Sequence, residues 1–342
     1  MSKYWTVVCG YFIALLFISQ PLLAQSVESS SVLKRVQEMG DLRCAVFPDD
    51  PGRSAIMPNG KWAGFYVDFC RAVAAAVLKN PDFVAYVEVG SKARFSVLQE
   101  SKADVVMYSS TWTLGRESDY QITFPAIYLF DGQGFMVRKA SGIKSINDLD
   151  GKSVCVTENT TTEQMLKAVI HNRQLNVKII YANGDSFFRG DCDAYTADRM
   201  NLATNRANRA DNPSNYLILD ETISREPIGP MVRNDDAQWA KVIRAVVNWM
   251  ILAEEKGVST KTLDEVMNNT QDPELKNVFG QTGNIAEQLG LPKEWASQVI
   301  RAVGNYGEVY DRHFGPNTAI GVERGLNRPW SEGGVLLSPL FK

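Results

Sequence analysis

Three polar segments of this 342-residue chain carry side chains suited to binding a small charged ligand. The first spans residues 107–128 and places Ser109 and Thr111 shortly before Arg116. A guanidinium group donates two parallel hydrogen bonds to a carboxylate, and hydroxyl groups complete such a receptor. A hydroxyl-rich turn beside a solvated arginine would give the same pattern, so these residues alone leave both interpretations open.

The second segment is a predicted helix start after a short strand. Thr160 and Glu163 have the spacing of a capping box, with Thr161 between them. The free N–H groups and the dipole of a helix N-terminus also attract anions. A well-capped helix and an anion site are compatible interpretations.

The third segment ends in Asp198, which follows an apolar-centred strand and precedes a helical pattern. An aspartate there either caps the helix or, if it faces a cleft, binds an ammonium group. Together the three segments offer a cationic fork, hydroxyls, a helix start and a carboxylate, which match an α-amino acid. They contain no nucleophile–base pair and no glycine-rich phosphate loop, so binding is favoured over catalysis.

Composition narrows the function further. The 36 Lys and Arg residues nearly balance 39 Asp and Glu residues, which argues against a nucleic-acid partner. With two histidines, His171 and His313, and no C-x-x-C spacing, we expect no metal site. The chain is longer than the roughly 250–300 residues that one core supports, which predicts two domains.

The N-terminus has the pattern of an export signal. Lys3 precedes an uncharged run, residues 4–23, and Ala24 ends it. We predict a signal peptide over residues 1–24; the alternative is a single membrane anchor.

Four cysteines remain after that segment, namely Cys44, Cys70, Cys155 and Cys192. An even number in an exported chain is consistent with disulfides, and four cysteines allow three connectivities. The alternative is four buried free thiols.

The elements that must position these groups alternate between strands and helices. The expected strands are residues 41–47, 83–89, 104–109, 153–157, 177–181, 193–196 and 216–219. The expected helices are residues 66–78, 94–102, 163–172, 199–205 and 236–256, with a mostly helical region after them. This alternation predicts an α/β fold with mostly parallel sheets, in which ligands bind at the carboxyl ends of strands.

Several stretches resemble one protein family. They include WAGFYVDFCRAVAAAV (62–77), SSTWTLGRE (109–117), CDAYTAD (192–198), SREPIGPMVR (224–233) and RGLNRPWSEGGV (324–335). The chain resembles the periplasmic amino-acid-binding proteins of ABC importers, the family-3 solute-binding proteins. Within them it is most similar to the general, or polar, L-amino-acid-binding subgroup.

The resemblance implies a two-lobed periplasmic-binding-protein type II fold with a hinge between the lobes and a helical C-terminal extension. Lobe 1 would be discontinuous, comprising residues 25–130 plus 228–342, and lobe 2 would comprise residues 131–227. The hinge crossings would fall near residues 130–135 and 227–232. Hinge closure around a ligand is the known motion of such proteins.

The implied function is extracytoplasmic binding of polar L-amino acids, such as Glu, Gln, Asp and Asn, and their delivery to an ABC permease. The protein would be a periplasmic monomer without cofactor, metal, nucleic acid or enzymatic activity. The alternatives are a periplasmic enzyme on the same fold, such as a cyclohexadienyl dehydratase-like lyase, or a module recruited for surface interaction. For the lyase, Glu158 is the candidate acid or base.

Carried over by position, Arg116 holds the ligand α-carboxylate. Ser109, Thr111 and the helix start at Thr160 and Thr161 assist it.

Asp198 takes the α-ammonium group in the same carry-over. Arg94 matches an arginine that contacts the ligand side chain in acidic-amino-acid binders, and its alternative is a surface position on a helix.

The family's glycine before the threonines is Asn159 here, and no aromatic lid residue can be placed in the loop 48–60. Trp112 either lines the cleft or packs at the hinge. The resemblance also implies pairing of Cys44 with Cys70 and of Cys155 with Cys192.

Overall fold

The structure, a computed structural model, describes Met1 and residues 31–342. Apart from Met1, the predicted signal peptide lies outside the described residues. Within the described part of the chain, no helix is both long and apolar enough to cross a membrane. The fold described below is that of the compact unit Ser31–Lys342.

The first lobe is built on a parallel three-stranded sheet. The strand order is β5 (Val84–Glu88), β1 (Leu42–Val46) and β6 (Val105–Val106). Because parallel neighbours need crossovers, helices α2 (Phe65–Leu78) and α3 (Ser96–Gln99) connect them. Nearly all of α2 is buried, which suits its run of alanines and branched residues. Helix α1 (Val32–Met39) packs on α2, and α4 (Leu114–Tyr120) follows β6.

A small antiparallel sheet occupies the segment between β1 and α2, where the sequence predicted only a loop. It consists of β2 (Asp49–Asp50), β3 (Ser54–Ile56) and β4 (Trp62–Ala63). Gly64 has a φ of 133°, and a Cβ there would lie 2.4 Å from the carbonyl oxygen of Arg53. Glycine therefore lets this sheet pack directly on the start of α2.

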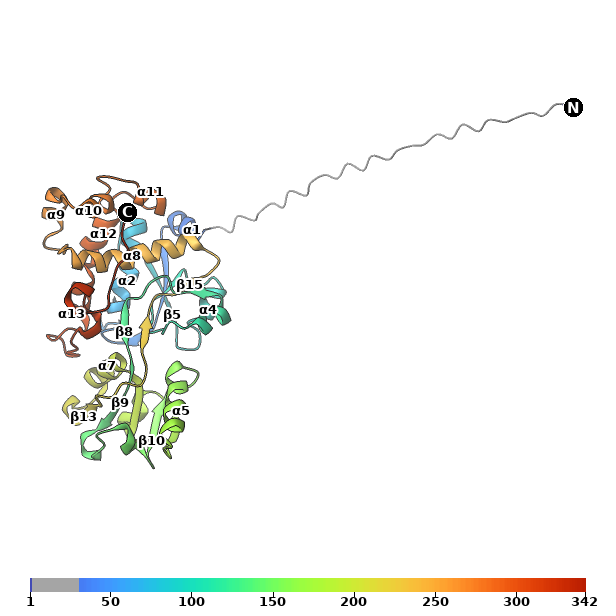
Figure 1. The fold of residues 1–342 in the computed structure, drawn as a ribbon, viewed down its shortest axis with the longest axis vertical. Coiled ribbons are helices and arrows are strands. Elements are labelled where there is room, and N and C mark those ends of the chain that lie inside the picture. The colour runs from blue at the N-terminus through green and yellow to red at the C-terminus, as the bar shows by residue number, and fades with distance from the viewer. Residues whose placement is uncertain (2–30) are drawn as a thin grey trace. The chain divides into compact units, whose positions relative to one another are not determined.

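The second lobe is built on a five-stranded sheet. Its order is β11 (Lys178–Tyr181), β10 (Ser153–Val156), β12 (Ala194–Asp198), β9 (Gln133–Arg138) and β13 (Tyr216–Ile218). Strands β10, β11 and β12 are parallel, whereas β9 is antiparallel to both of its neighbours. Helices α5 (Thr161–Arg173), α6 (Gly184–Arg189) and α7 (Arg199–Arg209) belong to this lobe. Figure 1 shows α5 and α7 on either side of the sheet.

Two antiparallel segments connect the two sheets. Strand β8 (Leu129–Asp131) leads into β9, and β14 (Glu226–Ile228) returns from β13 (Figure 1). Their register sets Asp131 opposite Glu226. A second pair, β7 (Ile122–Thr123) with β15 (Val232–Arg233), continues the connection on the first-lobe side.

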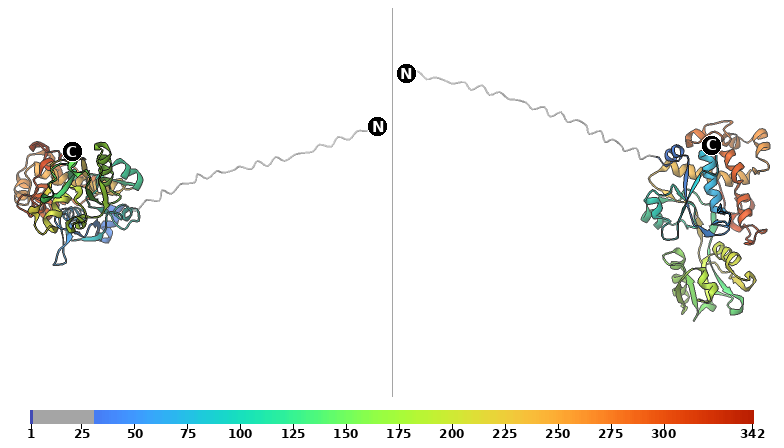
Figure 2. Two further views of the ribbon diagram at one scale, coloured as in Figure 1. Left: turned by 90° about the horizontal axis from the view of Figure 1, so that it is seen from below. Right: turned by 180° about the vertical axis from the view of Figure 1, so that it is seen from behind.

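The C-terminal region is helical and packs on the first lobe. It comprises α8 (Ala237–Glu255), α9 (Leu263–Asn269), α10 (Pro273–Val278), α11 (Ile285–Leu289), α12 (Trp295–Val303) and α13 (Tyr306–His313). Trp239, Trp249 and Trp295 are fully buried there, and α12 packs along α2. Figure 2 shows these orange and red helices beside α2 in a second view.

Each of the two larger sheets carries one disulfide. Cys44 of β1 bonds Cys70 of α2, and Cys155 of β10 bonds Cys192 just before β12. This is the connectivity that the resemblance implies. The bonds close loops of 26 and 37 residues, each worth about 3–4 kcal/mol in the chain-entropy account.

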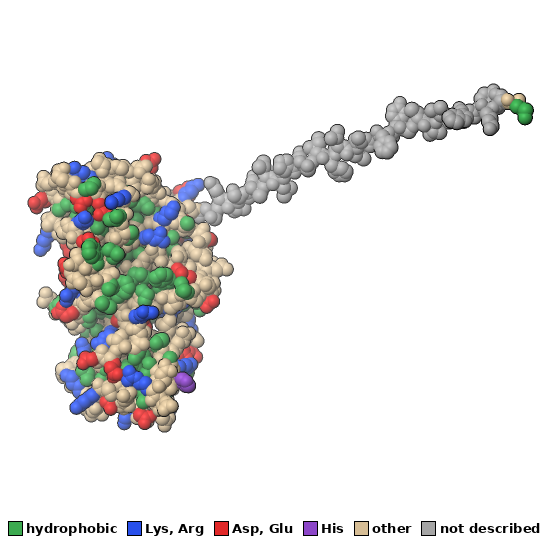
Figure 3. All heavy atoms as spheres, viewed as in Figure 1, with side chains coloured by type: hydrophobic (Ala, Val, Ile, Leu, Met, Phe, Trp, Pro, Cys, Tyr) green, Lys and Arg blue, Asp and Glu red, His purple; other side chains and the backbone are tan. Residues whose placement is uncertain are grey.

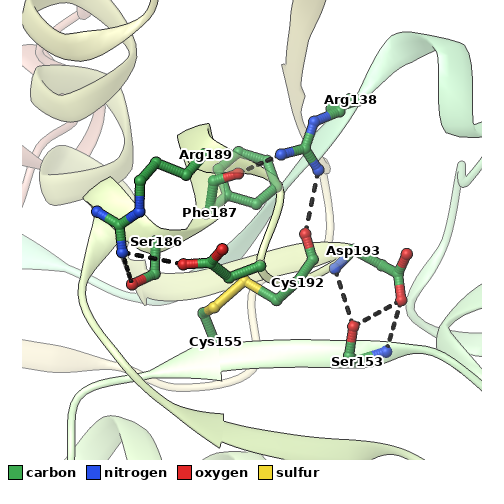
Figure 4. The surroundings of a disulfide bond; sticks show 9 residues. Arg138, Ser153, Cys155, Ser186, Phe187, Arg189, Cys192 and Asp193 are labelled. Atoms are coloured by element: carbon green, nitrogen blue, oxygen red, sulfur yellow. Dashed lines mark hydrogen bonds and ion pairs between the residues drawn. A yellow bond between two sulfur atoms is a disulfide. The ribbon is translucent and has the colours of Figure 1, made fainter.

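Hydrogen bonds surround the second disulfide (Figure 4). The Asp193 carboxylate accepts bonds from the Ser153 backbone N–H at 2.8 Å and hydroxyl at 2.7 Å. Arg138 donates to the carbonyls of Cys192 and Phe187. The start of β12 is thus held by polar contacts as well as by the covalent bond.

Candidate ligand-binding site

A cavity of about 280 Å³ lies where strand ends of both sheets meet. All seven side chains that the sequence singled out for binding line it: Ser109, Thr111, Arg116, Arg94, Thr160, Thr161 and Asp198. They come from four places in the chain that are far apart in sequence. On the outer face of the molecule that Figure 3 shows, acidic and basic side chains are interspersed, so charge of one sign is not concentrated on that face.

Arg116 is fixed by the backbone around it. The Thr113 side chain caps α4 by accepting from the Arg116 backbone N–H at 3.1 Å. The Arg116 Nη1 donates to the carbonyl oxygen of Thr111 at 2.6 Å, and the residue is 9% exposed. Burial, and next the charge of Arg94, lower the pKa of Arg116 to about 10. The guanidinium is still charged at neutral pH, and its remaining N–H groups are available to a ligand.

Arg94 is 4% exposed, so its alternative as a surface helix residue is wrong. It precedes α3, and its guanidinium lies over the rings of Phe95, at 4.8 Å, and Tyr108, at 5.3 Å. Burial lowers the pKa of Arg94, and its Nε has no hydrogen-bond partner among the described residues. A buried donor without an acceptor is costly, which favours a ligand acceptor at this place.

Ser109 belongs to a network that sequence reasoning missed. Its hydroxyl accepts from Arg53 Nη1 at 2.8 Å and lies 2.7 Å from the Tyr66 hydroxyl. Arg53 is 4% exposed and forms an ion pair with Asp50. Burial alone would lower the pKa of Arg53, but the charges of Asp50, Tyr66 and Asp198 together outweigh burial and the pKa is raised.

The start of α5 presents its backbone to the cavity. Thr160 accepts from the Glu163 backbone N–H at 3.1 Å, as the spacing predicted. The Glu163 carboxylate does not return to Thr160 but accepts from the Asn159 backbone N–H at 2.7 Å. The first N–H groups of the helix, beginning with that of Thr161, have no acceptor within it and suit an anion.

Asp198 stands at the N-cap position of α7, yet its side chain makes no capping hydrogen bond. Asp131 from β8 takes that place, because its Oδ2 accepts from the Met200 backbone N–H at 2.9 Å. The Asp198 carboxylate is therefore left for the cavity. The helix-cap interpretation does not describe how this side chain is used.

The charges of the cavity fall into two groups. Arg53 pairs with Asp50, and Arg209 pairs with Asp49 at 3.0 Å and with Asp185 at 2.9 Å. The other three charged residues lining the cavity, Arg94, Arg116 and Asp198, form no ion pair within residues 31–342. A complementary ligand carries one cationic group and up to two anionic or acceptor groups.

Comparison with known proteins identifies the family. The model of the bacterial extracellular solute-binding proteins, family 3, matches residues 42–275. The chain belongs to this family.

Two curated relatives match the solute-binding protein over nearly its whole length. The glutamate/glutamine/aspartate/asparagine-binding protein BztA of Rhodobacter capsulatus is 38% identical over 94% of this chain and 96% of its own. The general L-amino acid-binding periplasmic protein AapJ of Rhizobium johnstonii is 37% identical over 92% of this chain and 94% of its own.

A solved structure has the same fold. It is an ABC transporter periplasmic binding protein from Brucella ovis with glutathione bound. It is 34% identical and covers 91% of this chain and 99% of its own, with a TM-score of 0.88.

Several residues of this solute-binding protein that line the cavity had no clear sequence signal. Arg53 and Asp50 lie in the loop for which no element was predicted, and Tyr66 looked like an ordinary core residue of α2. Phe47, the last residue of the first predicted strand, also lines the cavity and meets Tyr108 edge-on at 6.2 Å. Its position as an aromatic residue at the carboxyl end of a strand was the one sequence signal that could have predicted Phe47 as a cavity residue.

Two other candidates lie outside the cavity lining. Trp112 is 39% exposed, and its backbone N–H donates to the Pro227 carbonyl at 2.7 Å, next to the connecting strands. The exposed Glu158 carboxylate lies with its Oε2 3.9 Å from the Lys92 Nζ.

Proposed function

We propose that this protein is an extracytoplasmic receptor that binds L-amino acids with acidic or amide side chains and delivers them to an ABC permease. The observation that carries the proposal is the set of three unpaired charges, Arg94, Arg116 and Asp198, in one cavity. Charges removed from water need opposite charges or hydrogen bonds, and a ligand with an ammonium group, a carboxylate and a further acceptor would supply the opposite charges.

An α-amino acid fits these charges group by group. Its carboxylate goes to Arg116, with Ser109, Thr111 and the helix start at Thr161 as further donors. Its ammonium group goes to Asp198. A side-chain carboxylate or amide oxygen then accepts from Arg94.

The relatives support this ligand class. The two curated proteins are named for binding glutamate, glutamine, aspartate and asparagine, or L-amino acids in general. We propose the periplasm as the location, and a monomer with lobes over residues 25–130 plus 228–342 and 131–227. The paired strands β8 and β14 would be the hinge.

We also propose that the protein is not an enzyme. The lyase alternative needs an acid or base aimed into the cavity, and Glu158, its candidate, is not among the cavity-lining residues. Within the described residues, no group of three potential metal ligands is assembled either.

A second candidate ligand is a γ-glutamyl peptide such as glutathione, which the Brucella ovis protein binds. Such a peptide also carries one ammonium and two carboxylates. The cavity extends past Asp198 to Asn183, Asn201 and Asn205, whose amides suit a peptide group.

The test is a thermal-shift screen of the twenty L-amino acids and glutathione, followed by calorimetry. We expect L-glutamate, L-aspartate and their amides to raise the unfolding temperature by several degrees at a hundred times the dissociation constant. Glutarate, which lacks the ammonium group, is the matched control. The transport interpretation fails if none of the twenty amino acids stabilises the protein, and a shift with glutathione alone would favour the peptide ligand.

A further inference from the structure

Three carboxyl groups meet where the connecting strands reach the cavity. Asp131 of β8 and Glu226 of β14 are directly opposed in register, and Asp198 ends the neighbouring strand β12. Asp131 is fully engaged, because it accepts from the backbone N–H groups of Gly132 at 2.8 Å and Met200 at 2.9 Å. Asp198 and Glu226 have no such backbone donors.

Glu226 is 3% exposed and only half satisfied. The Ser224 hydroxyl donates to its Oε1 at 2.7 Å, and that hydroxyl accepts in turn from the Gln133 backbone N–H at 2.8 Å. The Oε2 atom has no hydrogen-bond partner among the described residues. Burying a charged carboxylate oxygen without a hydrogen-bond donor costs free energy. A protonated oxygen at the same place can instead donate a hydrogen bond to a nearby acceptor.

The charges around Glu226 also disfavour its ionisation. The carboxyl groups of Asp131 on β8 and Asp198 at the end of β12 lie near Glu226, and Arg116 on α4 is a cation whose charge reaches it. Burial first, and then the charge of Asp198, raise the pKa of Glu226 to about 9. At neutral pH the side chain is therefore a neutral acid.

We propose that Glu226 is a positioning residue, a carboxylic acid that donates its Oε2 proton to the Asp198 carboxylate and aims that carboxylate at the ligand's ammonium group. This role accounts for how the Asp198 side chain is held in place. Because Asp198 does not cap α7, no backbone bond fixes its side chain. A hydrogen bond between the side chains of Glu226 and Asp198 supplies the missing contact. The inference rests on the proposed role of Asp198.

The binding experiment compares Glu226→Leu with Glu226→Gln, using L-glutamate as the probe in calorimetry. Losing a hydrogen bond to a charged group weakens binding by about ten- to a hundredfold, which we expect for Glu226→Leu. Glu226→Gln keeps a donor and the shape, so it should recover most of that loss. Equal loss in both variants, or no loss in Glu226→Leu, would overturn the proposal.

Glu274→Leu is the matched control. Glu274 is also buried, at 8% exposed, and accepts from the Phe341 backbone N–H far from the cavity. This variant should lower the unfolding temperature without changing the affinity for L-glutamate.

A second measurement needs no ligand. Isotope-edited infrared difference spectra of the unliganded protein at pH 7 should show the carbonyl stretch of a protonated carboxyl that Glu226→Gln removes. If that band is absent, Glu226 is ionised and the proposal is wrong. If the band is present but L-glutamate does not bind the unaltered protein, the proposed ligand class fails while the protonation state of Glu226 stands.

Discussion

At the scale of single residues, the charged side chains of the cavity fall into a group that forms ion pairs and a group that does not. Five of its eight charged side chains pair with one another, and Arg94, Arg116 and Asp198 do not. The paired group comprises three carboxylates and two guanidinium groups, whose charges are largely satisfied by one another. We therefore expect selectivity for a zwitterion with a further acceptor to depend on Arg94, Arg116 and Asp198.

Arg116→Ala and Asp198→Ala should each abolish the ligand-induced rise in unfolding temperature. Removing one partner of a desolvated charge pair costs about 3–5 kcal/mol, or roughly 10²–10³-fold in affinity. The measurement is calorimetry and thermal unfolding with L-glutamate. Arg138→Ala, which removes a guanidinium outside the cavity, serves as control and should keep the ligand-induced shift. An unchanged shift in either cavity variant would refute the site assignment.

At the scale of elements, the start of α5 shows how a helix is prepared for an anion. Asn159 has a φ of 60°, in the left-handed region where glycine and asparagine are tolerated. The family resemblance has glycine here, so the substitution preserves the backbone conformation. Glu163 then anchors the turn through the Asn159 N–H and through Lys167 at 2.6 Å, so the first helical N–H groups stay free.

Asn159→Ala should lower the free energy of unfolding by about 1–2 kcal/mol, because an ordinary Cβ is strained at positive φ. Asn159→Gly should cost little and is the paired comparison. Denaturant unfolding of both variants checks this. Equal stability of the alanine and glycine variants would show that this turn relaxes without strain.

A second element contact joins α13 to α2. The Asp68 carboxylate, 6% exposed, accepts from Arg312 Nη2 at 2.6 Å and lies 2.6 Å from His313 Nε2. Burial alone would raise the pKa of Asp68, but the hydrogen bond from His313 and the charge of Arg312 lower it below 3.8. A depressed carboxyl pKa stabilises the fold above the unfolded value and loses that contribution as the pH falls through the folded value.

Asp68→Asn should therefore destabilise the protein by about 1.5–3 kcal/mol at pH 7, because Arg312 and His313 lose a charged hydrogen-bond acceptor. The difference from the unaltered protein should shrink as the pH falls below 3.8, where Asp68 itself becomes protonated. Thermal unfolding across this pH range measures it. A difference that stays constant with pH would mean that the charge of Asp68 contributes nothing.

At the scale of the whole molecule, contacts cross the cavity mouth between the two lobes. Asn208 and Arg209 at the end of α7 donate to the carbonyls of Pro51 and Asp49, at 3.0 and 2.9 Å. The segment of the small sheet β2–β4 is thus hydrogen-bonded to α7 of the second lobe. Closure is an equilibrium, and a ligand shifts it only through contacts made in the closed state.

Arg209→Ala should weaken L-glutamate binding by a few fold while leaving the order of ligand preference unchanged. Its ion pair with Asp49 is partly exposed, and such pairs contribute about 1 kcal/mol or less. Calorimetry, with small-angle scattering of the unliganded protein to follow opening, tests the prediction. A change in which amino acid binds best would instead place Arg209 in ligand recognition.

The alternating pattern of strands and helices, the capped start of α5 and seven of the cavity-lining residues followed from the sequence, because local hydrophobic periodicity and family motifs encode them. The short strands β2–β4 did not, since two or three residues per strand leave no periodicity to detect. Only the tertiary structure shows which charges are paired. Arg53 pairs with Asp50, three residues before it, whereas the partners of Arg209 and the neighbours of Glu226 come from distant segments of the chain. Sequence determined which groups this protein has for binding, and the fold decided which of them remain for a ligand, because charge pairing depends on distances in space that spacing along the chain does not contain.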